Sequence, residues 1–205
     1  MRQVEVVPFL LVFILLPVIL AFSAPEIDWA EQRSRMVEEQ IKDRGISDPE
    51  VLRAMRRVPR HLFVPERYRY AAYEDRPLPI GEGQTISQPY IVALMTQLAD
   101  VDSGERVLEV GTGSGYQAAV LGRLAGAVYT VEIVQELGRE ARQRLREQGY
   151  DNVHVKIGDG FRGWPEQAPF DAIVVTCAPP EIPRPLKDQL AAEGRLVIPV
   201  GENWQ

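Results

Sequence analysis

The sequence predicts an α/β fold with a doubly wound, mostly parallel sheet, and three observations support this prediction. Beyond Gly104, short apolar runs alternate with amphipathic stretches that have helical spacing. The apolar runs are continuous, as in parallel strands that are covered on both faces. A glycine-rich turn directly follows the first of these runs, at the place where such sheets bind ligands.

Length and composition are those of an ordinary globular protein. The chain has 205 residues, enough for one domain and an appendage at roughly 150 residues per domain. It is 45% hydrophobic and 25% charged, with a formal net charge of −6 at pH 7. A negative balance disfavours nucleic-acid binding, which needs a basic surface for phosphates. With a single cysteine, Cys177, and two histidines, we expect no disulfide framework and no metal site.

The first segment differs from the rest of the chain. Residues 8–22 carry no charge, and the following Ser23 completes small-residue positions typical of a secretory cleavage site. This run is shorter than the ~20 residues that span a bilayer as a helix. We therefore predict that residues 1–23 form a signal-like or anchor segment, and that any membrane contact occurs through it alone.

Residues 24–100 are predicted to form N-terminal helices and a substrate-side loop. Apolar spacing indicates two amphipathic helices between Asp28 and Arg57. Ser47 is a suitable N-cap for the second helix, and Pro49 suits its first turn.

The stretch from Val58 to Pro89 is rich in proline and glycine, so it cannot be one regular element. A loop of this length in a compact domain is usually functional. Helical spacing returns from Pro89 to Leu98.

Residues 101–205 are predicted to form the cofactor-binding α/β core. The expected elements, in order, are strand 106–110, helix 116–124, strand 127–131, helix 134–148, strands 153–157 and 170–176, helix 185–192 and strand 195–199.

Three features at the expected carboxyl ends of successive strands predict a nucleoside site. The first strand runs into the glycine turn 111–115, where the backbone can approach a ligand closely. Glu132 ends the second strand 21 residues after Gly111, a spacing at which a carboxylate accepts hydrogen bonds from ribose hydroxyls. Asp159, between two glycines after the third strand, is placed to accept a hydrogen bond from an adenine amino group.

The turn has the pattern GxGxG and not the GxGxxG that binds a dinucleotide pyrophosphate. Glu109, just before the turn, would repel phosphate and attract an ammonium group. S-adenosylmethionine, which has a ribose, an ammonium and a sulfonium but no phosphate, fits these acids better than NAD. An NAD-dependent oxidoreductase is the alternative, but it needs a pyrophosphate site and a proton donor such as a Tyr-Lys pair, and the sequence shows neither.

Longer motifs identify a family that the sequence resembles. They are Leu78–Tyr90 (LPIGEGQTISQPY), Val107–Tyr116 (VLEVGTGSGY), Gly158–Gly160, Pro169–Thr176 and Ala178–Pro183. Over roughly Arg33 to Gly201 the chain is similar to the protein-L-isoaspartate O-methyltransferases. The resemblance implies a Rossmann-like, class I S-adenosylmethionine-dependent methyltransferase that methylates the α-carboxylate of L-isoaspartyl residues in damaged proteins and peptides. The ester then cyclises without the enzyme, and hydrolysis returns some normal aspartate.

The resemblance also implies roles for single residues. Ser87 would hydrogen-bond the substrate carboxylate as the catalytic residue, and Thr176 would line the methyl-transfer site. The cofactor would contact Gln84, Thr85, Ile86, Glu109, Gly111, Thr112, Gly113, Glu132, Asp159 and Gly160. Cys177 is expected to be a small core residue.

Two departures from the family leave alternatives open. The family continues with further strands, whereas this chain stops at Gln205, so we expect a core truncated at its C-terminus. A truncated binding protein without activity, or a methyltransferase acting on a small molecule, are therefore alternatives. The family is mainly cytoplasmic, whereas a signal-like segment would export or anchor the protein.

Overall fold

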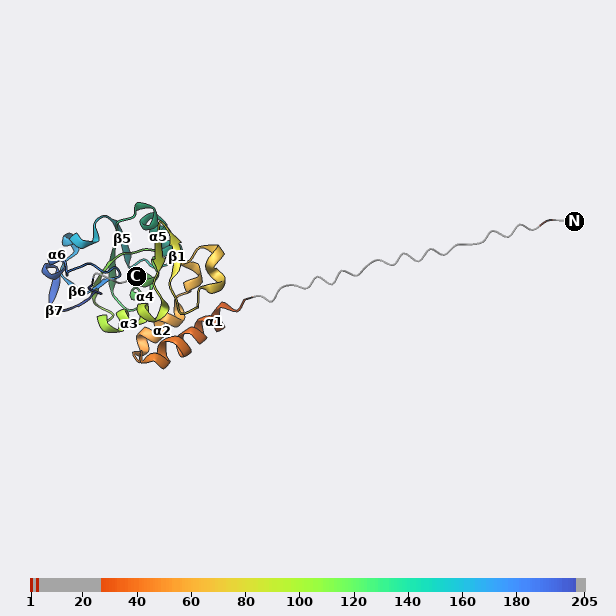
Figure 1. Ribbon diagram of the computed structural model, residues 1–205, viewed down its shortest axis with the longest axis horizontal. Helices are drawn as coiled ribbons and strands as arrows, with labels where there is room; N and C mark the ends of the chain where they lie inside the picture. Colours follow the sequence, from red (N-terminus) through yellow and green to blue (C-terminus); the bar gives the residue numbers. More distant parts are fainter. Residues whose placement is uncertain (2, 4–26, 202–205) are drawn as a thin grey trace.

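The computed structural model describes residues 1, 3 and 27–201 (Figure 1). Most of the predicted signal-like segment, residues 1–23, lies outside these described residues. Within the described part of the chain, no helix is both long enough and apolar enough to cross a membrane.

The N-terminal helices form where the sequence predicts them. Helix α1 (Trp29–Arg35) begins after Asp28, whose carboxylate accepts hydrogen bonds from two backbone N–H groups of the first turn. It continues through a π-helical segment (Met36–Ile41) and one 3₁₀ turn (Lys42–Arg44). Helix α2 (Pro49–Arg57) is capped by Asp48, which corrects the prediction of Ser47 as N-cap. The aspartate carboxylate accepts from both Glu50 and Val51 N–H groups.

The stretch predicted as a long loop contains a β-hairpin in addition to two 3₁₀ segments (Arg60–Leu62 and Glu66–Ala71). Strand β1 (Leu78–Gly81) pairs antiparallel with β2 (Gln84–Ile86). The turn has positive φ at Glu82 (51°) and at both flanking glycines, a backbone conformation that glycine adopts without strain. Helix α3 (Pro89–Ala99) begins after two further residues, so the hairpin is connected closely to the layer of helices.

The rest of the chain forms a parallel five-stranded sheet, which confirms the predicted fold class. The strands are β3 (Arg106–Val110), β4 (Ala127–Glu132), β5 (Val153–Ile157), β6 (Phe170–Val175) and β7 (Leu190–Val197), and the helices between them are α4 (Tyr116–Leu121), α5 (Gln135–Glu147) and α6 (Arg184–Asp188). Their order in the sheet is β5-β4-β3-β6-β7, with every neighbouring pair parallel. The chain changes direction across the sheet at β3, so a crevice is expected at the carboxyl ends of β3, β4 and β6.

The last predicted helix, 185–192, is shorter than expected because β7 begins at Leu190. Leu186 and Leu190 have helical spacing, but Leu190 pairs with Phe170 in the sheet. Ala172 pairs with Arg195, so β7 holds three more residues than β6 between these two pairs (195 − 190 = 5 against 172 − 170 = 2). A local i, i+4 pattern therefore could not distinguish this bulged strand from a helix.

Both faces of the sheet are covered. One large hydrophobic cluster contains residues of helices α2, α3, α4 and α5, of the hairpin and of one face of the sheet, and Trp29 of α1 packs against it. Both predicted units, residues 24–100 and 101–205, contribute to this cluster. A smaller cluster covers the opposite face beneath α6. Figure 1 shows α1, α2 and α3 gathered at one end of the molecule and β7 beside β6 at the sheet edge.

Candidate functional site

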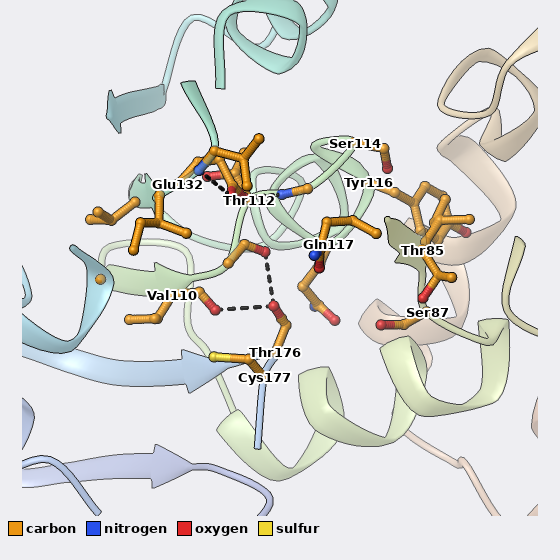
Figure 2. A pocket seen from close by; sticks show the side chains of 18 of the residues that line it. Thr85, Ser87, Val110, Thr112, Ser114, Tyr116, Gln117, Glu132, Thr176 and Cys177 are labelled. Carbon is orange, nitrogen blue, oxygen red and sulfur yellow. Dashed lines mark hydrogen bonds between the residues drawn. The ribbon is translucent and has the colours of Figure 1, made fainter. Parts of the chain in front are cut away.

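A cavity of about 270 Å³ lies at the carboxyl ends of β3, β4 and β6 and is closed on another side by the hairpin (Figure 2). All residues predicted for the site except Glu109 line it: Gln84, Thr85, Ile86, Ser87, Gly111, Thr112, Gly113, Glu132, Asp159 and Gly160. Thr176, expected at the methyl-transfer site, lines it as well.

The glycine turn is held against β6. Gly111 has φ +97°, and a Cβ at this position would collide with the Thr176 hydroxyl. That hydroxyl lies 3.0 Å from the Val110 carbonyl oxygen and 2.8 Å from that of Gly111, to which it donates. The turn therefore needs glycine for its conformation and for its close approach to the next strand.

Glu132 is fixed in the cavity wall by backbone donors. Its Oε2 accepts from the Gly113 N–H at 2.7 Å and its Oε1 from the Val134 N–H at 2.9 Å. The side chain is 5% exposed, so these bonds hold the carboxylate in one orientation. Each carboxylate oxygen can accept more than one hydrogen bond, which leaves acceptor capacity for a pair of hydroxyls on a ligand.

Asp159 lies two residues after the end of β5 and directly before a short 3₁₀ turn. Its Oδ1 accepts from the Phe161 N–H at 3.0 Å, and its Oδ2 lies 3.4 Å from the Arg162 Nε. The neighbouring Gly160 packs so closely on Val110 that a Cβ would collide with that side chain. The strand end therefore leaves room for a flat group beside a carboxylate.

Ser87 joins the hairpin to α3 and enters the cavity from the side opposite the strand ends. In Figure 2 it lies with Thr85 on one side of the cavity, and Glu132 lies on the other. Among the described residues, no hydrogen bond connects its hydroxyl to a histidine or a carboxylate. The hydroxyl is thus free to donate to a bound group.

Glu109 does not reach the cavity, contrary to its expected contact with an ammonium group. Side chains alternate along β3, so Glu109 faces the same side of the sheet as Val107 and points into the large cluster. It is 0% exposed, and neither carboxyl oxygen has a hydrogen-bond partner in the described structure. Burial raises the pKa of Glu109 to about 8.

Several lining residues were not found from the sequence. Ile133 and Phe161, each next to or near a strand-end acid, are apolar yet 71% and 38% exposed. Their signal was present, because each lies within two residues of Glu132 or Asp159. Gln117 carries no such signal and is found only in the folded chain.

Cys177 also lines the cavity and is exposed, which corrects its expected place in the core. It follows β6 in a proline-rich connection, where the strand has already left the sheet. Partial burial raises the pKa of its thiol above the usual value.

The charges of the cavity discriminate between nucleotide classes. Its lining, as formed by the described residues, includes two carboxylates, Glu132 and Asp159, and no lysine, arginine or histidine. A pyrophosphate would find no counter-charge there, whereas a ligand that carries positive charge and a ribose fits the donor and acceptor set. These residues therefore fit S-adenosylmethionine.

Comparison with known proteins agrees with this geometry. The family model for protein-L-isoaspartate(D-aspartate) O-methyltransferase matches residues 31–205. A protein-L-isoaspartate O-methyltransferase of Gloeobacter violaceus is 61% identical over 166 residues, which is 81% of each chain. That of Opitutus terrae is 57% identical over 191 residues, 93% of this chain and 82% of the relative.

A solved structure from Plasmodium falciparum extends the likeness to three dimensions. This protein-L-isoaspartate O-methyltransferase, in complex with S-adenosyl-L-homocysteine, aligns with a TM-score of 0.73 and 29% identity over 84% of this chain and 85% of that chain. The resemblance noted in the motifs is thereby confirmed: the chain belongs to the protein-L-isoaspartate O-methyltransferase family.

Proposed function

We propose that this protein transfers the methyl group of S-adenosylmethionine to the α-carboxylate of L-isoaspartyl residues in damaged proteins and peptides. One observation supports this most directly. One cavity, to whose wall the described part of the chain contributes no cationic side chain, has the Glu132 carboxylate on one side and the Ser87 hydroxyl on the opposite side. Family membership agrees with the proposal.

When bound, the cofactor supplies an electrophilic methyl group on a sulfonium. The acceptor carboxylate is ionised at neutral pH, so attack on that methyl group needs no general base. This accounts for a Ser87 hydroxyl without a basic partner. Ser87 would donate a hydrogen bond to the acceptor and hold one carboxylate oxygen in line for attack, which is catalysis by orientation.

The remaining residues would bind the cofactor. Glu132 would accept from the ribose hydroxyls, and Asp159 from the adenine amino group, with Gly160 clearing space for the ring. The backbone of the glycine turn would approach the cofactor closely, and Gln84, Thr85 and Ile86 would cover it from the hairpin. Apolar lining residues, among them Val110, Val131 and Val134, would exclude water from the methyl-transfer site.

The decisive experiment compares two peptides of one sequence, containing either L-isoaspartate or L-aspartate. We expect methyl incorporation from labelled S-adenosylmethionine into the isoaspartyl peptide alone. Incorporation into small molecules but neither peptide would support the alternative substrate class. Tight cofactor binding without any transfer would support the alternative of a binding protein without activity.

For location, the charge-free residues 8–22 support a separate proposal, that the N-terminal segment targets the protein out of the cytoplasm. N-terminal sequencing of the protein from fractionated cells tests it. A new N-terminus near residue 24, or recovery with the membrane, is expected. An intact Met1 in the soluble cytoplasmic fraction would contradict it.

A further inference from the structure

Gln117 is a polar cavity residue that the roles above leave unused. It lies in the first turn of α4, directly after the glycine turn, and is only 7% exposed. In Figure 2 its side chain enters the cavity between Glu132 on one side and Ser87 on the other. A buried amide at this place contacts whatever lies between the two ends of the cavity.

A hydrogen-bonded relay determines which end of the carboxamide faces the ligand. The Thr96 hydroxyl donates to the Val92 carbonyl at 2.7 Å, which uses its one hydrogen. The Thr96 Oγ1 must therefore accept a hydrogen bond from the Gln117 Nε2, which lies 2.8 Å away. Thr96 is 1% exposed, so water does not compete for these bonds. The Gln117 Oε1 is left as an oriented acceptor.

The position of this acceptor indicates its partner. With the ribose at Glu132 and the acceptor carboxylate at Ser87, the methionine portion of the cofactor occupies the space near Gln117. That portion carries an ammonium, which donates hydrogen bonds, and a carboxylate, which only accepts them. A carbonyl oxygen attracts the first and repels the second. Glu109, the acid expected to bind the ammonium, is sealed in the large cluster.

We propose that the Oε1 of Gln117 accepts a hydrogen bond from the α-ammonium of S-adenosylmethionine and positions the methionine end of the cofactor. This assignment rests on the proposed function, since it requires the cofactor in this cavity. Thr96 acts through Gln117 as a positioning residue. Its relay prevents the carboxamide from turning its N–H groups toward the ammonium.

The test compares two ligands by calorimetry: S-adenosylhomocysteine and the analogue in which hydrogen replaces its α-amino group. Hydrogen bonds to charged groups contribute enough that losing one weakens binding by about tenfold. We expect Gln117→Leu to bind S-adenosylhomocysteine about tenfold more weakly than the unaltered protein, and the deaminated analogue equally well. An equal loss for both ligands, or no loss for either, would overturn the assignment.

Two further variants separate this role from a structural one. Thr96→Val should produce a smaller loss confined to S-adenosylhomocysteine, and Thr96→Ser, which keeps the hydroxyl, should restore its affinity. Gln117→Met gives a second apolar replacement if the leucine variant does not fold. A raised KM for the isoaspartyl peptide with unchanged S-adenosylhomocysteine affinity would place Gln117 against the acceptor and contradict the proposal. If the unaltered protein binds neither ligand, the proposed function itself fails.

Discussion

Individual polar side chains in the cavity differ in how firmly the structure holds them. Glu132 is held by two backbone N–H groups, and Gln117 by a buried hydroxyl. Among the described residues the Ser87 hydroxyl has no such partner, so it can adjust its direction to a bound group. Side chains that are held in one orientation, such as Glu132 and Gln117, suit the proposed cofactor, whose position must be constant. A free hydroxyl suits an acceptor substrate, which binds and dissociates in every reaction cycle.

Ser87→Ala should lower kcat/KM for an isoaspartyl peptide by about 10- to 100-fold, because one hydrogen bond to a charged group is lost at the reacting carboxylate. Its affinity for S-adenosylhomocysteine, measured by calorimetry, should stay unchanged. Ser103→Ala, the same change at an exposed loop residue, is the control and should keep full activity. Unaltered kcat/KM in Ser87→Ala would remove this residue from the mechanism.

Glu109 should make the stability of the protein depend on pH. Burial raises its pKa in the folded state to about 8, from an ordinary value of 4.5. Between these values the unfolded chain releases the proton and the folded chain keeps it, so stability falls as pH rises from 4.5 to 8.

Glu109→Gln removes this titration. The Tm of the variant should therefore rise progressively relative to that of the unaltered protein across that window and level off above it. The corresponding gain in unfolding free energy should be on the order of a few kcal/mol. Thermal melts at several pH values measure the trend, with Glu82→Gln at the exposed hairpin turn as control. A Tm difference that is the same at pH 4.5 and pH 8 would show that Glu109 is not held protonated.

At the scale of elements, the glycine turn links β3, α4 and β6 into one site. The positive φ of Gly111 and the hydrogen bonds from the Thr176 hydroxyl to the Val110 and Gly111 carbonyl oxygens both depend on the backbone conformation of this turn. Ile133 and Phe161, which follow β4 and β5, also line this cavity. A change in the turn should therefore affect binding and folding together.

Gly111→Ala should lower both Tm and cofactor affinity, because the new methyl group collides with Thr176 at a positive φ. Strain of this kind costs about 1–3 kcal/mol. Gly104→Ala is the matched control: nothing lies within 4 Å of its Cβ position and its φ is not positive. We expect that variant to be neutral in melts and in S-adenosylhomocysteine titrations. Equal effects of the two changes would contradict the close-approach argument.

At the scale of the whole molecule, one cluster joins the N-terminal helices to the sheet. Met55 of α2 is fully buried and its sulfur accepts a weak hydrogen bond from the Tyr116 hydroxyl of α4 at 3.9 Å. Tyr116 also lines the cavity. Helix α2 is therefore structurally coupled to the cavity through Tyr116.

We expect one cooperative unfolding transition in calorimetry, with equal calorimetric and van't Hoff enthalpies. Met55→Ala should shift that whole transition downward by about 2–5 kcal/mol, because it leaves a cavity between the helices and the sheet layer. Arg57→Ala, on the exposed side of the same helix, should change stability by less than ~0.5 kcal/mol. Two separate transitions, of which Met55→Ala moves only one, would show that the helices fold independently.

The amino-acid order by itself determined the fold class, the positions of most strands in the parallel sheet and about half of the residues that line the cavity. Apolar runs, glycine turns and strand-end acids are local patterns, and parallel strands bring their carboxyl ends to one edge whatever else the chain does. These local patterns did not predict the hairpin or the start of β7 at Leu190. Strand pairing depends on a distant partner, Phe170 in the case of Leu190, and periodicity does not reveal that partner.

Only the tertiary structure decided which polar groups line the cavity. Glu109 lies two residues before Gly111 of the glycine turn, yet strand alternation directs it into the large cluster. Gln117 carries no sequence signal, yet the turn into α4 places it in the cavity wall, where its Nε2 donates to the Thr96 hydroxyl. The direction of a side chain depends on which layers pack against its element, and that is a property of the whole fold.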